Sequence, residues 1–170
     1  MEKGPLVSVV MGSKSDFSIM QKCMEALDKF GIEYEVRVLS AHRTPEKTAA
    51  FAKELEKRGV KVVIAGAGGA AHLAGTIASY TTLPVIGVPL PTSHLKGIDA
   101  LYSTVQMPPG VPVACMALGE WGASNAAIFT LQILSLLDDF FKEKLKDYKK
   151  ELSSQEVKRD EKDKNFNKGN

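Results

Sequence analysis

The run EYEVRVLSAHRTP, residues 33–45, joins a strand pattern to a helix start, and the rest of the chain repeats this unit. Its first half alternates polar and apolar side chains, which is typical of a β-strand. Thr44 can cap a following helix, and Pro45 suits the first helical position. His42 and Arg43 therefore lie where a strand meets a helix N-terminus. Unpaired backbone N–H groups and the helix dipole at such a junction favour an anion such as a phosphate.

Strand and helix patterns alternate along the whole chain outward from this run. Apolar runs predict strands at residues 6–11, 33–38, 62–65 and 84–88 and within 111–118. Helical spacing predicts helices up to Gly31, over residues 45–58, 73–80 and 98–105, and from about residue 124, after an exit loop of residues 119–125. Strict alternation implies right-handed crossovers and a parallel sheet. We therefore expect an α/β fold, a flavodoxin-like three-layer sandwich with a five-stranded parallel sheet.

The composition changes after about Asp138. Residues 140–148 keep helical periodicity with a thin apolar stripe, for which a neighbouring subunit is a plausible cover. From Ser153 onward only Val157 and Phe166 are strongly apolar. We therefore predict one catalytic domain with its C-terminal helix over residues 1–150. Residues 151–170 are expected to be a charged tail, either disordered or a loosely held helix.

Charge and composition exclude several classes of partner. From Lys142 onward there are ten Lys/Arg against seven Asp/Glu, so the basic excess belongs to the tail and the folded part lacks a nucleic-acid footprint. No apolar run approaches the roughly 20 residues of a membrane span, and no signal-peptide segment is evident. Cys23 and Cys115 lie in separate apolar segments and are interpreted as buried hydrophobes in a reducing compartment. We expect a cytoplasmic protein without membrane or nucleic-acid partners.

A polar turn, GSKSD at residues 12–16, follows the first strand. One reading is a phosphate cradle formed with Ser13 and Ser15, beside an Asp16 that binds sugar hydroxyls. The other is that Ser15 or Asp16 only caps the next helix. Arg43 favours the first reading, because a phosphate needs a fixed guanidinium as well as N–H groups.

A glycine run, GAGGAA at residues 66–71, resembles a dinucleotide fingerprint but follows the third strand, and the next strand ends without an acidic residue. It fits close approach of a ligand or a tight turn. His42 and His72 follow strands that look adjacent, so both could face one cleft and carry protons. A structural hydrogen bond is the alternative for each, whereas His94 is expected to be exposed. The residues alone indicate a cofactor-independent enzyme or a binding protein for a small phosphorylated, sugar-bearing ligand.

Four motifs together resemble the N5-carboxyaminoimidazole ribonucleotide mutase family: MGSKSD at 11–16, SAHRTP at 40–45, AGAGGAAHL at 65–73 and YSTVQMP at 102–108. The resemblance spans about residues 6–137. It implies an isomerase of de novo purine biosynthesis that moves a carboxyl group from N5 of the substrate to carbon 4 of the imidazole. It also implies that no metal or organic cofactor is used, and that the chain is a homo-octamer whose C-terminal helix reaches a neighbour.

The resemblance further implies a role for each matching residue. His42 is the general acid–base, and His72 belongs to the catalytic set. The expected substrate contacts are Ser13, Ser15 and Arg43 to the 5′-phosphate, Asp16 to the ribose, Ser40 and Ala41 to the base, and Gly68, Gly69, Ala70 and His72 over the carboxylate. The chain departs from the family pattern at Ala74, where proline is usual, and at Trp121, where small residues are usual.

Two other functions remain open from the sequence. A second branch of the same family carboxylates aminoimidazole ribonucleotide directly with carbon dioxide, although the loop at residues 68–72 resembles the mutase branch. A non-catalytic protein that binds sugar phosphates on a flavodoxin-like scaffold is the third possibility.

Overall fold

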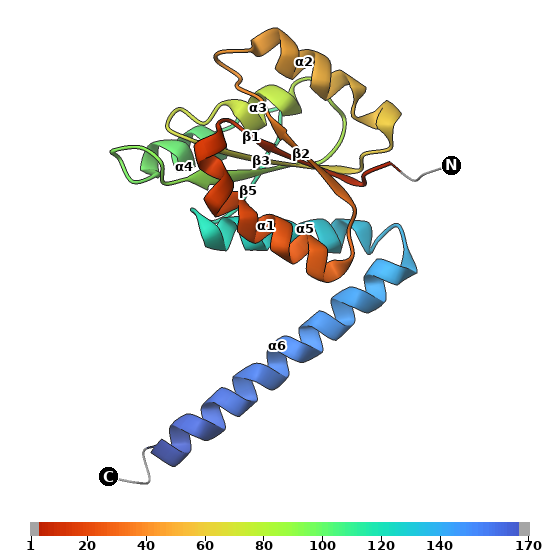
Figure 1. Ribbon diagram of the computed structural model, residues 1–170, viewed down its shortest axis with the longest axis vertical. Coiled ribbons are helices and arrows are strands. Elements are labelled where there is room, and N and C mark those ends of the chain that lie inside the picture. Colours follow the sequence, from red (N-terminus) through yellow and green to blue (C-terminus); the bar gives the residue numbers. More distant parts are fainter. Residues whose placement is uncertain (1–3, 167–170) are drawn as a thin grey trace. The chain divides into compact units, whose positions relative to one another are not determined.

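One parallel sheet of five strands organises the fold. The computed structural model describes residues 4–166, with the side chains described to residue 154. The strands are β1 (Val7–Met11), β2 (Tyr34–Val38), β3 (Val62–Gly68), β4 (Val85–Leu90) and β5 (Ala114–Cys115). Their order is β2-β1-β3-β4-β5, all parallel, with Val9 of β1 in register with Val36 and Ile64 (Figure 1). The predicted flavodoxin-like sheet is confirmed.

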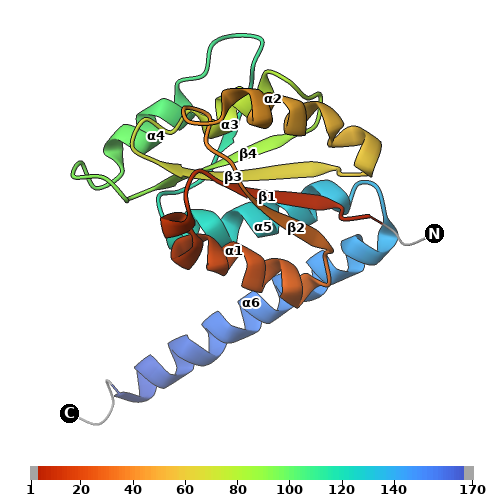
Figure 2. The same cartoon turned by 45° about the horizontal axis from the view of Figure 1, so that its top comes forward.

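Helices cover both faces of this sheet. They are α1 (Phe17–Phe30), α2 (Pro45–Glu54), α3 (Leu73–Ala78), α4 (Ile98–Val105) and α5 (Glu120–Leu134), with short 3₁₀ turns η1 (Lys14–Asp16) and η2 (Glu56–Arg58). Figure 2 shows α1 and α5 on one face and α2, α3 and α4 on the other. Because each strand is followed by a crossover, the carboxyl ends of all strands lie along one edge of the sheet.

Burial on both faces explains why the strands read as nearly continuous apolar runs. On one face, Val10 and Val63 belong to a buried cluster with Leu55 and Ile77. On the other, Met20 of α1 lies against Gly66, where a Cβ atom would meet the methionine sulfur. The glycines at the end of β3 therefore serve close packing, and β3 extends through Gly68 although the sequence predicted a loop from Gly66.

Two helix boundaries differ from the prediction. The helix expected over 45–58 stops at Glu54 and resumes as the 3₁₀ turn η2. Helix α5 begins at Glu120, so the expected loop of residues 119–125 is mostly helical. Gly119 has φ 71° and donates its N–H to the Pro89 carbonyl, and Ala123 donates to the Gly119 carbonyl, so the helix starts there. Trp121 is 82% exposed on this helix.

The chain divides into two compact units, Met1–Thr130 and Leu131–Asn170, and the second contains α6 (Asp139–Phe166). The Asp138 carboxylate accepts the N–H of Phe140 and so caps α6, and Lys–acid pairs three residues apart line its surface. For residues 151–170 the structure describes helix to Phe166, and residues 167–170 lie outside the described part. Within residues 4–166 no helix is long and apolar enough to cross a membrane.

Candidate active site

The loop after β1 is fixed by its own polar atoms. Ser13 and Asp16 form a capping box around η1: the Ser13 hydroxyl accepts the Ser15 N–H, and the Ser13 N–H donates to Asp16 Oδ2 at 2.9 Å. The Ser15 hydroxyl lies 3.0 Å from that of Ser13. Asp16 is only 3% exposed. Burial raises the pKa of the Asp16 carboxyl above its usual value of 3.8, and the Ser13 N–H and the Arg43 charge offset this only in part.

The loop after β2 presents its charged groups outward. The Ser40 hydroxyl accepts both the backbone N–H and the Nε of Arg43, at 3.2 and 3.3 Å, which orients the guanidinium. Arg43 also donates from a terminal nitrogen to the Gly12 carbonyl at 3.2 Å, so it links the two loops. Thr44 occupies the N-cap position of α2, but its hydroxyl bonds back to Ser40 instead of capping the helix as predicted.

The loop after β3 brings a second imidazole to the first. Gly69 turns the chain with φ 63°, and His72 follows immediately before α3. Nε2 of His42 lies 2.8 Å from Nδ1 of His72, with the rings edge to face and their centroids 4.7 Å apart. The strands before these residues are β2 and β3. The sequence predicted that they are neighbours, but β1 lies between them. The two histidines thus meet across the end of β1, each exposed to solvent.

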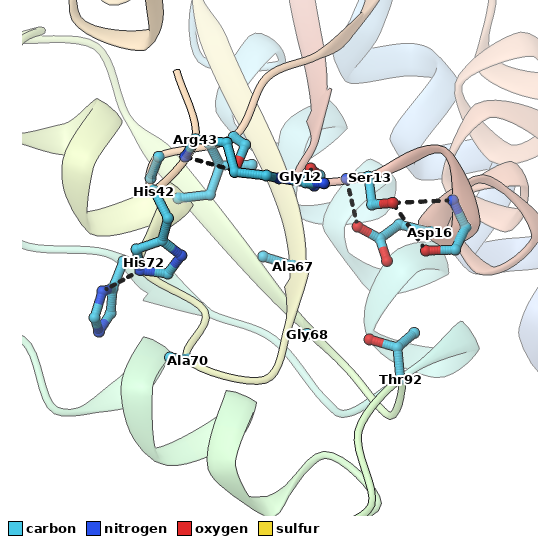
Figure 3. Close-up of a pocket in the computed structure, with 14 residues that line it drawn as sticks. Gly12, Ser13, Asp16, His42, Arg43, Ala67, Gly68, Ala70, His72 and Thr92 are labelled. Carbon is cyan, nitrogen blue, oxygen red and sulfur yellow. Dashed lines mark hydrogen bonds between the residues drawn. The ribbon is translucent and has the colours of Figure 1, made fainter. Parts of the chain in front are cut away.

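A cleft of about 380 Å³ opens between these three loops and the loop after β4. It has the size of a site for a small ligand. Every predicted site residue lines it except Gly69, which shapes the loop beside it. Figure 3 shows the cleft, whose lining residues are Gly12, Ser13, Ser15, Asp16, Ser40, Ala41, His42, Arg43, Ala67, Gly68, Ala70, His72, Leu73 and Thr92.

The lining includes residues that sequence reasoning did not assign to the site. Gly12, Ala67 and Leu73 lie within the motifs at 11–16 and 65–73, so their positions follow from these motifs. Thr92 comes from the loop after β4, and the position of that loop at a strand's carboxyl end was the signal that could have identified it.

The lining combines a permanent cation, a single buried carboxylate and two imidazoles. A guanidinium beside the N–H groups of a helix start suits an anionic group, and a carboxylate suits hydroxyls. Imidazoles can accept and donate protons near neutral pH. Across the described part of the chain, no cluster of three or more His, Cys, Asp or Glu side chains is placed to hold a metal ion.

The fold and the cleft define a flavodoxin-like α/β protein with a site for a small anionic ligand at the carboxyl edge of its sheet. The chain belongs to the AIR carboxylase family, whose model matches residues 6–155.

Among its relatives, the N5-carboxyaminoimidazole ribonucleotide mutase of Saccharolobus solfataricus is 54% identical over 148 residues, covering 87% of this chain and 92% of that protein. The mutase of the same name from Aquifex aeolicus is 57% identical over 132 residues, covering 78% of each chain. The crystal structure of Treponema denticola PurE matches with a TM-score of 0.84 and 33% identity, covering 93% of this chain and 98% of that one.

Proposed function

We propose that this protein is an isomerase that interconverts N5-carboxyaminoimidazole ribonucleotide and 4-carboxy-5-aminoimidazole ribonucleotide in de novo purine biosynthesis. The observation that carries the proposal is the single cleft that joins Arg43, Asp16 and the His42–His72 pair. These groups match the phosphate, the sugar and the proton chemistry of such a substrate. The names of the relatives support the same reaction.

In the proposed reaction His42 moves one proton between two atoms of the substrate. The bond from N5 to the carboxyl carbon breaks, carbon dioxide leaves, and the electron pair returned to N5 takes a proton from His42. Carbon 4 then attacks the carbon dioxide, and the proton on carbon 4 passes to His42, which restores the starting state. The 2.8 Å contact with His72 can fix the ring orientation and tautomer of His42 for both transfers.

The remaining residues bind the substrate and retain carbon dioxide. Backbone N–H groups stabilise a carboxylate without protonating it, and a closed site keeps the carbon dioxide beside carbon 4. The proposed contacts are Ser13, Ser15 and Arg43 to the phosphate, Asp16 to the ribose, Ser40 and Ala41 to the base, and Gly68, Gly69, Ala70 and His72 over the carboxylate.

The test supplies the purified protein separately with N5-carboxyaminoimidazole ribonucleotide and with aminoimidazole ribonucleotide plus bicarbonate. We expect the first to be converted with the higher kcat/KM. A higher kcat/KM for the second would assign the protein to the direct carboxylases. Binding of both without turnover would instead identify a sugar-phosphate binding protein.

We extend the proposal to assembly and setting: a cytoplasmic homo-octamer that needs no metal or organic cofactor. Exposed apolar side chains at Phe140 and Leu152, both beyond Asp138, support a subunit contact through the C-terminal helix. Light scattering of the full chain and of a chain ending at Asp138 tests this. The full chain should have eight subunits and the shortened chain fewer, whereas an intact oligomer after truncation would refute the contact.

A further inference from the structure

Thr92 is a polar residue of the cleft to which the proposed function gives no task. It lies two residues beyond the end of β4, in the loop that leads to α4. It lines the same cleft as Asp16 and His42. Its hydroxyl has no hydrogen-bond partner among the residues that the structure describes, whereas the neighbouring Ser93 hydroxyl donates to Asp99. A free hydroxyl in a polar cleft is available to a ligand.

The absence of a side chain at Gly68 leaves room for this hydroxyl. A Cβ atom at position 68 would overlap Thr92 Oγ1 and lie 3.1 Å from the Leu90 carbonyl oxygen. The Thr92 hydroxyl therefore rests against the α-carbon of Gly68, at the point where β3 ends. A threonine side chain has few accessible χ1 rotamers because it is branched at Cβ. Contact with Gly68 and branching at Cβ limit the positions that this exposed hydroxyl can take on the cleft wall.

Thr92 touches Gly68, the first of the residues proposed to lie over the carboxylate. In the view of Figure 3 it lies on the same side of the cleft as Asp16, with His42, His72 and Arg43 on the other side. Asp16 offers only acceptor atoms when ionised, and its Oδ2 already accepts the Ser13 N–H. A ribose presents two adjacent hydroxyls, each of which both donates and accepts. The Thr92 hydroxyl can do both as well, so it complements the Asp16 carboxylate.

We propose that Thr92 is a further substrate-binding residue whose hydroxyl hydrogen-bonds a ribose hydroxyl of the ribonucleotide. The inference rests on the proposed function, because it assumes a ribonucleotide in the cleft. It assigns recognition of the sugar to two loops, the one after β1 through Asp16 and the one after β4 through Thr92. A packing role against Gly68 alone would need the shape of the side chain but not its hydroxyl.

The experiment compares Thr92→Val, which keeps the shape and removes the hydroxyl, with Thr92→Ser, which keeps the hydroxyl. We expect Thr92→Val to raise KM for N5-carboxyaminoimidazole ribonucleotide about three- to tenfold with kcat within about twofold, as for one lost hydrogen bond. Thr92→Ser should stay near the wild type. Thr82→Val is a control for the loss of a threonine hydroxyl outside the cleft: Thr82 is exposed before β4, at the opposite end of the strand, and its hydroxyl donates to Glu56.

Deoxyribose forms of the substrate identify the partner of the hydroxyl. The wild type should bind either the 2′-deoxy or the 3′-deoxy form more weakly than the full substrate. Thr92→Val should bind that deoxy form as well as it binds the full substrate, because the hydrogen bond is already lost. The inference would be overturned by equal KM values for Thr92→Val and the wild type. It would also be overturned if the losses from Thr92→Val and from each deoxy form simply add. In both cases wild-type turnover would still uphold the proposed function. KM values are compared at a temperature at which circular dichroism shows the wild type, Thr92→Val and Thr92→Ser to be folded, so a lower melting temperature of Thr92→Val leaves the comparison valid. Absence of wild-type turnover would overturn the proposed function and this inference with it.

Discussion

The loop after β1, residues 12–16, and the loop after β2, residues 40–44, both line the cleft but are built in opposite ways. In the first, Ser13, Ser15 and Asp16 bond to one another, and the Asp16 carboxylate is buried. In the second, His42 and Arg43 are exposed and reach to other loops, Arg43 to Gly12 and His42 to His72. The first loop fixes a shape, and the second supplies groups that a ligand can still engage.

The sequence explains this difference. The first loop has the Ser-x-x-Asp spacing of a capping box, which satisfies N–H groups within the loop. The second begins a helix with Pro45, which has no N–H, and the Thr44 hydroxyl is used by Ser40. Changes in the second loop should therefore alter turnover and binding with little effect on stability, whereas a change at Asp16 should alter stability.

The largest effect is expected at His42. We expect His42→Asn to lower kcat about 10²- to 10⁴-fold, because general acid–base catalysis contributes that much, while the substrate dissociation constant changes little. Steady-state assays and calorimetric titration measure the two quantities. His94→Asn is the control, since His94 is exposed and does not line the cleft. An unchanged kcat in His42→Asn would remove His42 from the proton transfers and leave the two loops without a functional difference.

Arg43 should show the next largest effect, on binding. We expect Arg43→Ala to raise the substrate dissociation constant about 10- to 100-fold, the range for a hydrogen bond to a charged group, with kcat nearly unchanged. Arg37→Ala provides the control, because Arg37 lies in β2 and pairs with Glu35 outside the cleft. Equal affinity of both variants would show that the phosphate is held by the first loop alone.

The sequence predicted the strands, their parallel arrangement and three of the loops at the cleft. Buried parallel strands are continuous apolar runs, and the carboxyl ends of such strands must share an edge. Glycine residues led to wrong predictions of two element boundaries, the end of β3 and the start of α5. Gly66 and Gly122 were interpreted as loop residues, but a side chain at 66 would meet Met20 and one at 122 would overlap the Ala117 carbonyl. Glycine at these positions reflects close packing, which depends on tertiary structure.

The contact between the histidines and the position of Thr92 in the cleft could not be predicted from the sequence, for a related reason. His42 and His72 come from strands separated by β1, so their 2.8 Å contact depends on how far two loops extend across the sheet edge. Thr92 lies in a loop of ordinary polar composition, and only its packing against Gly68 distinguishes it. Residue type and spacing do not encode such distances between loops.

A smaller effect is expected at Ser40, which orients Arg43. We expect Ser40→Ala to raise the dissociation constant about two- to fivefold, because it removes the acceptor of two Arg43 donors without removing the charge. Ser79→Ala is a control with a hydroxyl outside the cleft, bonded to the Thr76 carbonyl. The double variant Ser40→Ala/Arg43→Ala should bind more weakly than Arg43→Ala, because Ser40 is also proposed to contact the base. Equal binding of the two variants would mean that Ser40 acts only through Arg43.

The smallest effect concerns the buried carboxylate of the first loop and is measured without ligand. Burial raises the pKa of Asp16 above its unfolded value of 3.8, so the carboxylate binds a proton more tightly in the folded state than in the unfolded state. The stability that protonation provides is therefore fully present below pH 3.8 and is lost as the pH rises through the folded pKa. Relative to Asp16→Asn, which cannot titrate, the wild type should gain thermal stability on acidification, by no more than about 4 °C in Tm.

Thermal melts of both proteins from pH 8 to pH 4 test this, because the other carboxylates titrate in both and cancel in the difference. The same pair of melts in an Arg43→Ala background connects the two loops. Arg43 lowers the pKa of Asp16 through its charge, so its removal should raise that pKa further and enlarge the difference. If the curves of the wild type and Asp16→Asn run parallel, burial and local hydrogen bonding balance at Asp16. The Asp16 carboxyl would then have ordinary acidity despite its burial.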